Sequence, residues 1–296
     1  MTEQHVYDVV VIGCGPAGLS AAINVKVRNR DVVVLGTEQC SPPLDKAPRI
    51  VNYLGFTGVT GVRLREKFVE HARIMGVDIK RARVDAIMPM DDVFMVTSRE
   101  EVYLGRTVII ATGTPYRPRL GGEQEFLGRG LGYCATCDGP LYRGKDVAII
   151  AHSPEAEVEA NFMGEICRKV YYLPLYGPPT ALEDTVQVVE GKPTKVLGSK
   201  VVNALQVGDT MLKVDGVFIV GAETPPERLF PGIELEDNHI RVNRQQETSV
   251  PRVYAAGDCT GPPYQIAKAV GEGLVAGLAA AKLVVALRPR GTSQPA

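Results

Sequence analysis

"VYDVVVIGCGPAG", residues 6–18, joins a strand-like run of β-branched residues to a turn that holds three glycines. A helix-like stretch and a second apolar strand, residues 31–36, follow directly. The order strand, glycine turn, helix, strand is typical of a βαβ unit that binds a dinucleotide. In such a unit Gly13 permits the tight turn, Gly15 lets the backbone approach a pyrophosphate, and Gly18 lets the helix pack on the strand. The start of the helix then faces the phosphates with its unpaired N–H groups.

A second unit of the same order begins with "KDVAIIA", residues 145–151, and continues through a helix-like stretch into the strand-like "KVYYLPLY". Two such openings in one chain predict two domains of the doubly wound type. We therefore expect an α/β fold of two Rossmann-like, three-layer domains, the second inserted into the first. The expected boundaries place the dinucleotide-binding domain at residues 1–114 and 243–296 and the inserted domain at residues 115–242.

Composition and charge argue against several classes of protein. The chain has 296 residues, of which 45% are hydrophobic and 23% charged, as in a soluble globular protein with well-formed cores. Its net charge of −1 argues against nucleic-acid binding, which needs a basic surplus. No export signal is expected at the N-terminus. The longest apolar stretch, residues 270–287, contains charged residues and glycines, so we expect a core helix rather than a membrane span, and a cytoplasmic protein.

Two cysteines, Cys134 and Cys137, are separated by two residues within "YCATCDGPLY", residues 133–142. Such a pair could be a redox disulfide, half of a metal site or two buried structural thiols. A zinc site needs two further ligands, and the chain has no second C-x-x-C and only four histidines, which are scattered. The metal interpretation is therefore disfavoured, and no metal site is expected. The other cysteines stand alone in the sequence and are expected to be small, semi-buried fillers: Cys14, Cys40, Cys167 and Cys259.

Four segments together resemble one known family. They are "GCGPAG", "ATGTPYRP" at residues 111–118, "CATCDG" at residues 134–139 and "AAGDC" at residues 255–259. With these segments in this order, the chain resembles the low-molecular-weight thioredoxin reductases over nearly its whole length, and "CATCDG" is the most specific part. The resemblance implies a homodimeric flavoprotein that binds FAD in its first domain and reduces thioredoxin.

The resemblance also implies roles for the residues of the C-x-x-C segment. Cys134 and Cys137 would form a disulfide that alternates with a dithiol. Cys137 would lie nearer the flavin and accept electrons, and Cys134 would attack the substrate disulfide. Asp138 would donate or accept the proton beside the leaving sulfur.

The cofactor contacts are carried over where the motifs match. An acid that follows a strand and a glycine, such as Asp258, can bond a ribityl hydroxyl, which distinguishes flavin from nicotinamide binding. Glu38 is the candidate for the ribose hydroxyls, Asn52 for the flavin edge and Val84 for the adenine. Tyr53 and the nearby "SPPLDK" depart from the family pattern. The full set of expected contacts is Gly13, Gly15, Pro16, Ala17, Gly18, Gly36, Thr37, Glu38, Asn52, Val84, Thr112, Gly113, Asp258, Gln265, Ile266 and Ala267.

The second domain lacks the features that would hold NADPH. After its first strand the chain reads "AHSPEA", residues 151–156, without a glycine, and the proline removes an N–H donor. Negative charge from Glu155, Glu157 and Glu159 at the start of the next helix would repel a phosphate. Residues 171–179 offer no cation for a 2′-phosphate. Ordinary NAD(P)H use is therefore disfavoured, and the departure resembles the ferredoxin-dependent flavin thioredoxin reductases of anaerobic bacteria.

The leading hypothesis is a ferredoxin-linked flavoprotein that reduces thioredoxin. One alternative is an atypical reductase that uses NADPH or a deazaflavin. Another is a flavin-dependent dithiol oxidase that closes disulfides in small metabolites and passes the electrons to oxygen. A third is a non-catalytic redox sensor or scaffold that keeps its flavin. Because ferredoxins are usually acidic, docking is expected at cations that flank the cysteine segment: Arg117, Arg119, Arg143 and Lys145.

Overall fold

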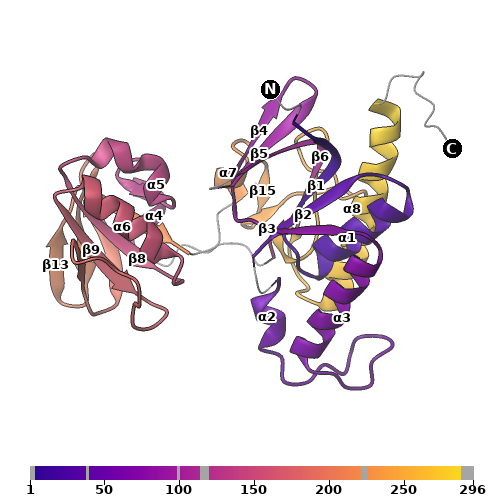
Figure 1. Cartoon of the computed structure of the whole chain (residues 1–296), viewed down its shortest axis with the longest axis horizontal. Helices are drawn as coiled ribbons and strands as arrows, with labels where there is room; N and C mark the ends of the chain where they lie inside the picture. Colours follow the sequence, from indigo (N-terminus) through magenta and orange to yellow (C-terminus); the bar gives the residue numbers. More distant parts are fainter. Residues whose placement is uncertain (1–3, 38–39, 99–100, 114–119, 222–225, 288–296) are drawn as a thin grey trace. The chain divides into compact units, whose positions relative to one another are not determined.

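The chain folds into two compact units (Figure 1). The computed structural model describes residues 4–37, 40–98, 101–113, 120–221 and 226–287. The first unit consists of residues 1–115 and 225–296, and the second unit, inserted between these two segments, consists of residues 116–224.

The chain returns to the first unit at residue 225, earlier than the expected residue 243. The segment between these positions holds α7 (Pro226–Leu229), β15 (Leu235–Glu236) and β16 (His239–Ile240). Its side chains Leu229, Phe230 and Ile240 are buried in a core shared with strands of the first unit. Because these elements are too short to show a periodic pattern, the sequence does not reveal which unit their apolar residues join.

The first unit is built on one mixed sheet. Its parallel strands are β1 (Val6–Ile12), β2 (Val32–Gly36), β3 (Asp78–Arg81), β6 (Val102–Ile110) and β17 (Val253–Ala255), in the order β3-β2-β1-β6 with β17 beside β6. The antiparallel strands β4 (Val84–Met90) and β5 (Val93–Ser98) extend the sheet from the first half of β6. The carboxyl ends of the parallel strands meet at one edge, which is where doubly wound folds bind their ligands.

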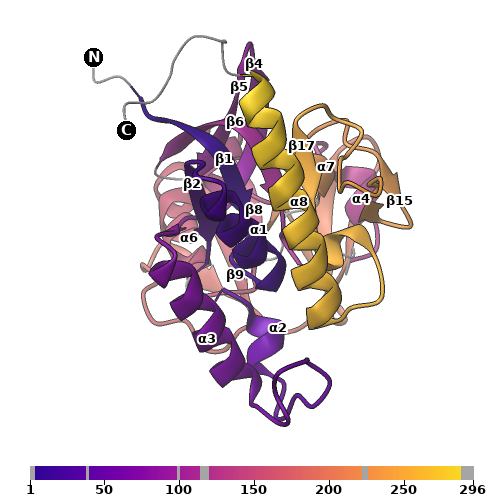
Figure 2. The same ribbon diagram turned by 90° about the vertical axis from the view of Figure 1, so that its right-hand side faces the viewer.

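Helices α1 (Pro16–Val27), α3 (Gly61–Ile74) and α8 (Ile266–Leu287) lie over one face of this sheet (Figure 2). Within the described residues, α8 is the one helix long and apolar enough to cross a membrane. It packs tightly on α1 instead, because a Cβ at Gly273 would lie 2.1 Å from the carbonyl oxygen of Ala17. One side of α8 is thus buried against α1, as expected for a helix that packs on the core of its unit. The short helices α2 (Pro42–Asp45) and η2 (Asp258–Thr260) belong to loops of the same unit.

The second unit has a parallel sheet of its own. Its strands are β7 (Leu131–Gly132), β8 (Asp146–Ala151), β9 (Lys169–Pro174), β10 (Val186–Val188) and β14 (Gly216–Val220), in the order β10-β9-β8-β14-β7. One face carries α5 (Ala135–Asp138), η1 (Gly139–Tyr142) and α6 (Ala156–Ile166). The other face carries the antiparallel strands β11 (Pro193–Gly198), β12 (Val202–Val207) and β13 (Thr210–Lys213), and α4 (Glu123–Phe126) packs beside β11.

Both units therefore have three layers around a central sheet, and the expected α/β fold with an inserted second unit is confirmed. In each unit one outer layer is helical. The other face is covered in the first unit by the 226–240 segment, which packs with side chains of β4 and β5 from the extended part of the sheet, and in the second unit by β11 to β13. Short antiparallel strands can bury one face on the sheet and leave the other to water, so they serve as a covering layer as well as helices do.

Candidate active site

The glycine turn after β1 contains two glycines that the fold requires and one that it does not. Gly13 has a φ of 109°, and a Cβ on it would lie 2.1 Å from the carbonyl oxygen of Ala111. A Cβ on Gly18 would lie 1.8 Å from the carbonyl oxygen of Gly13. A Cβ on Gly15 would meet only ordinary contact, 3.6 Å from the carbonyl oxygen of Cys40. Packing within the protein therefore does not require a glycine at position 15. The missing side chain instead leaves the Gly15 backbone open to a ligand, as a pyrophosphate site requires.

Helix α1 begins directly behind this turn, with Pro16 as its first residue and Gly15 as its N-cap. Within the described residues no side chain caps the helix, and its first turn contains no acid. Its first backbone N–H groups and the positive end of its dipole are therefore available to an anion. The local geometry fits the phosphates of a dinucleotide.

The loop that carries Asp258 lies against the same helix. A Cβ on Gly257, which has a φ of 92°, would lie 2.9 Å from the Cβ of Ala17. Thr112, which is exposed, and Gly113 follow β6 at the same sheet edge. Burial raises the pKa of Asp258; the charge of Lys268 opposes this shift, and that of Glu272 adds to it.

Lys268 and Glu272, both on α8, hold the Asp258 loop in place. The Lys268 ammonium donates to the carbonyl oxygens of Gly257 and Gly261, each at 2.7 Å, and lies 3.0 Å from the Glu272 carboxylate. Glu272 in turn accepts from the Gly257 N–H at 2.9 Å. This pair was not among the residues expected at the site. The available signal was a Lys and a Glu four residues apart at the start of an otherwise apolar helix.

The structure also joins two residues expected at the flavin edge. The Asn52 amide donates to the side-chain oxygen of Gln265 at 3.0 Å, although 213 residues separate them. Both are exposed, as is Ala267 in the first turn of α8. Ile266, the first residue of α8, packs with Leu44 and its neighbours instead of facing solvent. The start of α8 and the Asn52 loop therefore form one surface.

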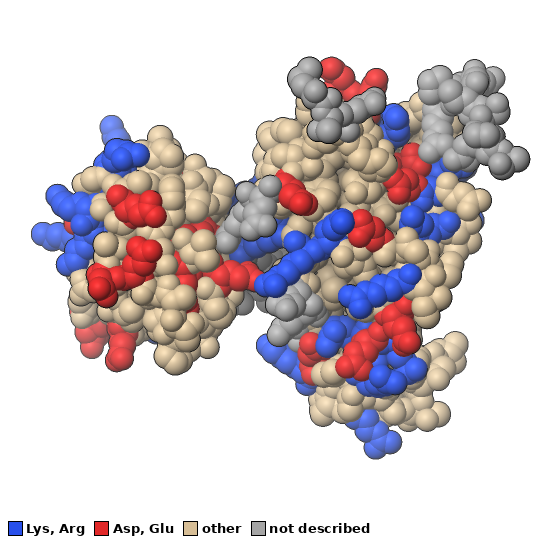
Figure 3. All heavy atoms as spheres, viewed as in Figure 1, with Lys and Arg blue, Asp and Glu red and all other residues tan. Residues whose placement is uncertain are grey.

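A pocket of about 730 Å³ opens at the carboxyl ends of β2 and β3. Gly36 and Thr37, both expected cofactor contacts, line it. Its other lining residues include interleaved cations and acids, as Figure 3 shows for this part of the first unit: Arg63, Arg65, Arg73, Lys80, Arg81, Glu66 and Glu70. Val84 is buried as the first residue of β4 and is absent from this lining. Glu38, expected at the ribose, lies outside the described residues.

Cys14 and Cys40 form a disulfide, which corrects the expectation that both are isolated fillers. Cys14 belongs to the glycine turn and Cys40 follows β2, so the bond ties these two segments together. A Cβ on Gly36 would lie 2.2 Å from the Cys14 sulfur, so the glycine at the end of β2 makes room for it. Neither remaining cysteine is poised to react. Burial raises the pKa of Cys167 to about 11 and that of the fully buried Cys259 to about 12.

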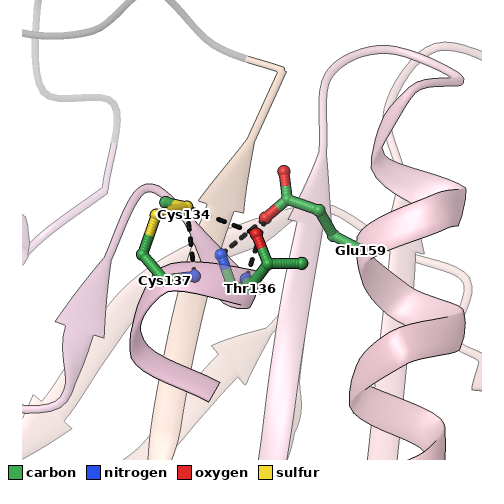
Figure 4. The surroundings of a disulfide bond; sticks show 5 residues. Cys134, Thr136, Cys137 and Glu159 are labelled. Carbon is green, nitrogen blue, oxygen red and sulfur yellow. Dashed lines mark hydrogen bonds between the residues drawn. A yellow bond between two sulfur atoms is a disulfide. The ribbon is translucent and has the colours of Figure 1, made fainter. Parts of the chain in front are cut away.

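In the second unit, Cys134 and Cys137 are joined as a disulfide, which confirms the expected pairing (Figure 4). Cys134 is the N-cap of α5, and its sulfur accepts from the Cys137 N–H at 3.2 Å. Cys134 is buried, whereas Cys137 is exposed. Asp138 ends α5 and packs on β7, where a Cβ on Gly132 would lie 2.9 Å from its carboxylate.

A buried acid from α6 contacts this turn. The Glu159 carboxylate accepts from the backbone N–H of Ala135 at 2.6 Å and of Thr136 at 3.3 Å. From the sequence, Glu159 was expected only to repel phosphate, and its place beside the cysteines was not predicted. The missed signal is its spacing in the helix, since Glu159 follows Ala156 by three residues and precedes Met163 by four, and both are core residues.

The turn after β8, residues 152–155, differs from its counterpart in the first unit. The turn itself has no glycine. The nearby glycine is Gly221, which directly follows the neighbouring strand β14, and a Cβ on it would lie 2.5 Å from the hydroxyl of Ser153. The Glu157 carboxylate accepts from the N–H groups of Thr180 and Ala181 and from the Tyr176 hydroxyl. Burial by itself would raise the pKa of Glu157, but these hydrogen bonds hold it below its ordinary value. The backbone at residues 180–181 thus holds an acid of the first turn of α6.

The chain is similar to proteins of one kind throughout its length. A family described as pyridine nucleotide-disulphide oxidoreductase matches residues 7–156 and 180–273. The thioredoxin reductase of Aquifex aeolicus is 33% identical over 86% of this chain and 86% of its own length. The thioredoxin reductase of Listeria monocytogenes is 29% identical over 97% of each chain. The crystal structure of a ferredoxin-flavin thioredoxin reductase from Clostridium acetobutylicum superposes with a TM-score of 0.91 at 46% identity, covering 96% of this chain and 100% of that one.

Proposed function

The chain belongs to the pyridine nucleotide-disulphide oxidoreductase family and, within it, to the thioredoxin reductases, and we propose that it reduces thioredoxin with electrons from reduced ferredoxin. It is a flavoprotein disulfide oxidoreductase. The observation that carries the choice of donor is the contrast between its two glycine-turn positions. The turn of the first unit is open at Gly15, whereas the corresponding residues 152–155 contain no glycine and lead into a helix whose first turn holds Glu157 and Glu159.

The flavin of this enzyme is proposed to be FAD. The open turn at Gly15 and the uncapped start of α1 suit a pyrophosphate, which FAD has and FMN lacks. The Asp258 loop, held by Lys268 and Glu272, would bind the ribityl chain, and Asn52 with Gln265 would contact the flavin edge. When bound, the flavin supplies the ability to take up electrons one at a time and to pass on two.

A nicotinamide dinucleotide would need a second open turn. Residues 151–156 provide no glycine for it, and the two acids in the first turn of α6, Glu157 and Glu159, would repel a phosphate at that helix start. A protein donor needs no such pocket, because it can deliver electrons by docking on the surface. The similar Clostridium acetobutylicum structure is described as a ferredoxin-flavin thioredoxin reductase, which supports the same donor.

The residues of the second unit would carry the disulfide chemistry in balanced steps. Two electrons enter at Cys137, the S–S bond breaks, and the Cys134 sulfur leaves and takes up a proton, for which Asp138 would be the donor. Cys134 returns this proton to Asp138 as it attacks the thioredoxin disulfide; a mixed disulfide forms, and the thioredoxin sulfur that leaves takes up the proton. Cys137, left as a thiolate, then resolves the mixed disulfide and restores the Cys134–Cys137 bond; the second thioredoxin sulfur takes its proton from water, so thioredoxin is released as a dithiol with two electrons and two protons. We propose that this exchange takes place in the cytoplasm, where disulfides in proteins are mostly catalytic.

An anaerobic titration tests the donor. Reduced ferredoxin should bleach the flavin absorbance on the timescale of turnover, and the electrons should then appear as thioredoxin thiols. NADPH and NADH at micromolar to millimolar concentrations should not bleach it. A variant with both Cys134→Ser and Cys137→Ser is the control, because its flavin should still be bleached while thioredoxin stays oxidised. Rapid bleaching by NADPH, without any by ferredoxin, would refute the proposed donor.

A further inference from the structure

The Glu159 carboxylate lies inside the second unit and binds the backbone of the C-x-x-C turn. The residue has 0% exposure, and carboxylates are rarely buried unless hydrogen bonds compensate for the lost water. Its partners are the N–H groups of Ala135 and Thr136, the two residues between the cysteines. Figure 4 shows the side chain reaching from α6 to the start of α5, beside Cys134.

These two N–H groups are donors that would otherwise favour a thiolate on Cys134. In C-x-x-C turns, N–H groups at the start of the helix lower the pKa of the first cysteine and stabilise the reduced form. Here Cys134 is the N-cap of α5 and directly precedes both donors. Glu159 takes up those donors and places a carboxylate at the same helix start, where a thiolate would form.

We propose that Glu159 is a positioning residue that fixes the C-x-x-C turn and makes its dithiol more strongly reducing. The inference rests on the proposed role of Cys134 and Cys137 as the redox pair. Reduction breaks their S–S bond and adds two electrons and two protons, and one thiol can then lose its proton. A nearby carboxylate disfavours that thiolate but does not act on the neutral disulfide. The equilibrium moves toward the disulfide, so the dithiol passes its electrons to thioredoxin more readily.

The test compares two buried glutamates of the same helix. Glu159→Gln removes the charge and keeps the side-chain shape. The matched control is Glu157→Gln, whose carboxylate binds the backbone of Thr180 and Ala181 instead of the cysteine turn. Each purified flavoprotein is equilibrated anaerobically with dithiothreitol buffers of known ratio. Alkylation and peptide mass spectrometry then measure the Cys134–Cys137 disulfide separately from the Cys14–Cys40 disulfide.

In Glu159→Gln the equilibrium should shift about tenfold toward the dithiol, which is about 30 mV for a two-electron couple. In Glu157→Gln it should remain at the wild-type value, although that variant should be less stable to heat. An unchanged constant in Glu159→Gln overturns the proposal. An equal shift in both variants also overturns it, because altered packing would then account for the effect.

If Glu159→Gln does not fold, Glu159→Asp provides the test. Its carboxylate is one methylene further from the two N–H groups, so a smaller shift in the same direction is expected, and a wild-type constant overturns the proposal. The measurement uses neither ferredoxin nor thioredoxin. Failure of the proposed function would therefore give a different result. Glu159→Gln would still show the expected shift in the equilibrium constant, but ferredoxin would not transfer electrons to the wild-type protein.

Discussion

The two sulfurs of the C-x-x-C pair have different surroundings within their unit. Cys134 is 3% exposed and is held by the start of α5, whereas Cys137 is exposed. An electron carrier outside the unit would therefore meet Cys137 first, and Cys134 would be the sulfur that leaves when the bond breaks. The exposure of Cys137 suits the role proposed for it, and single substitutions can separate the roles of the two residues.

Replacing Cys134 with Ser should leave Cys137 as a free thiolate on the exposed side of the turn. A long-wavelength absorption band from a thiolate beside the oxidised isoalloxazine is then expected, and Cys137→Ser should lack it. Both variants should lose thioredoxin reduction by roughly 10³-fold or more, because two-electron exchange requires both sulfurs. Cys167→Ser is the control, since Cys167 is a thiol outside the pair. Activity retained in both single variants would show that the pair is not the catalytic disulfide.

At the scale of elements, the βαβ openings of the two units perform different tasks. In the first unit a glycine turn leads into a helix whose first turn holds no acid, which suits an anion, whereas the first turn of α6 holds Glu157 and Glu159. In the second unit the corresponding helix α6 turns two of its acids inward, with Glu157 on the loop at Thr180 and Glu159 on the cysteine turn. Through Glu159 the second opening thus supports the cysteine turn.

Substitutions at two glycines of the turn after β1 should separate an effect on ligand binding from an effect on folding. Gly15→Ala should fold, because the added Cβ meets only an atom at 3.6 Å, but it should weaken flavin binding by about tenfold or more, since the Cβ stands where the pyrophosphate approaches. Gly18→Ala should be destabilised by about 1–3 kcal/mol or fail to fold, because its Cβ would lie 1.8 Å from a carbonyl oxygen. Flavin content and the thermal unfolding of the apoproteins measure both effects. Equal flavin affinity in Gly15→Ala and wild type would refute the assignment of Gly15.

The Cys14–Cys40 disulfide joins the glycine turn to the loop after β2. The oxidised, denatured protein should therefore present two thiols to a thiol reagent, Cys167 and Cys259, and all six cysteines only after reduction. The double variant Cys14→Ser, Cys40→Ser should present the same two thiols and lose up to about 3 kcal/mol of unfolding free energy, the typical value for a short loop. Four thiols in the oxidised wild-type protein would mean that one of the two bonds is not formed.

Both units of the molecule begin with a βαβ unit of the kind that binds dinucleotides. Within the described residues, the glycine turn at Gly13, Gly15 and Gly18 is found in the first unit and has no counterpart after β8. The proposed donor is then a protein, and its approach depends on surface charge. Arg143 and Lys145 are exposed beside the cysteine segment, and the Lys145 ammonium lies 5.3 Å from the ring centre of Tyr142. Arg117 and Arg119, the other expected docking residues, lie outside the described residues.

The rate of flavin reduction by ferredoxin should fall as salt rises, because the Debye length shortens to roughly 8 Å at physiological ionic strength. Reversing the charge of Arg143 and Lys145 to Glu should lower the rate at low salt by about tenfold and flatten its salt dependence. Lys213→Glu, on the opposite outer layer of the second unit, is the control. Stopped-flow absorbance measures these rates. A rate that does not respond to salt would exclude electrostatic steering of the donor.

The sequence by itself was sufficient for the features that local patterns encode. The strand, the turn with Gly13, Gly15 and Gly18, and the following helix were predicted within a few residues, because steric limits and periodicity act over short stretches. The Cys134–Cys137 pairing was predicted from the resemblance to the thioredoxin reductases, and a spacing of two residues supports it because both sulfurs then lie within one turn. The loss of the second glycine turn was also visible directly in residues 151–156.

Only the tertiary structure decided the contacts between distant segments. It paired Cys14 with Cys40, placed Glu159 on the cysteine turn, joined Asn52 to Gln265 and assigned residues 226–242 to the first unit. An isolated Cys or Glu carries no mark of its partner in the sequence. Its partner depends on which strand ends and helix faces the packed sheet brings together, and that is settled by burial of apolar surface over the whole unit.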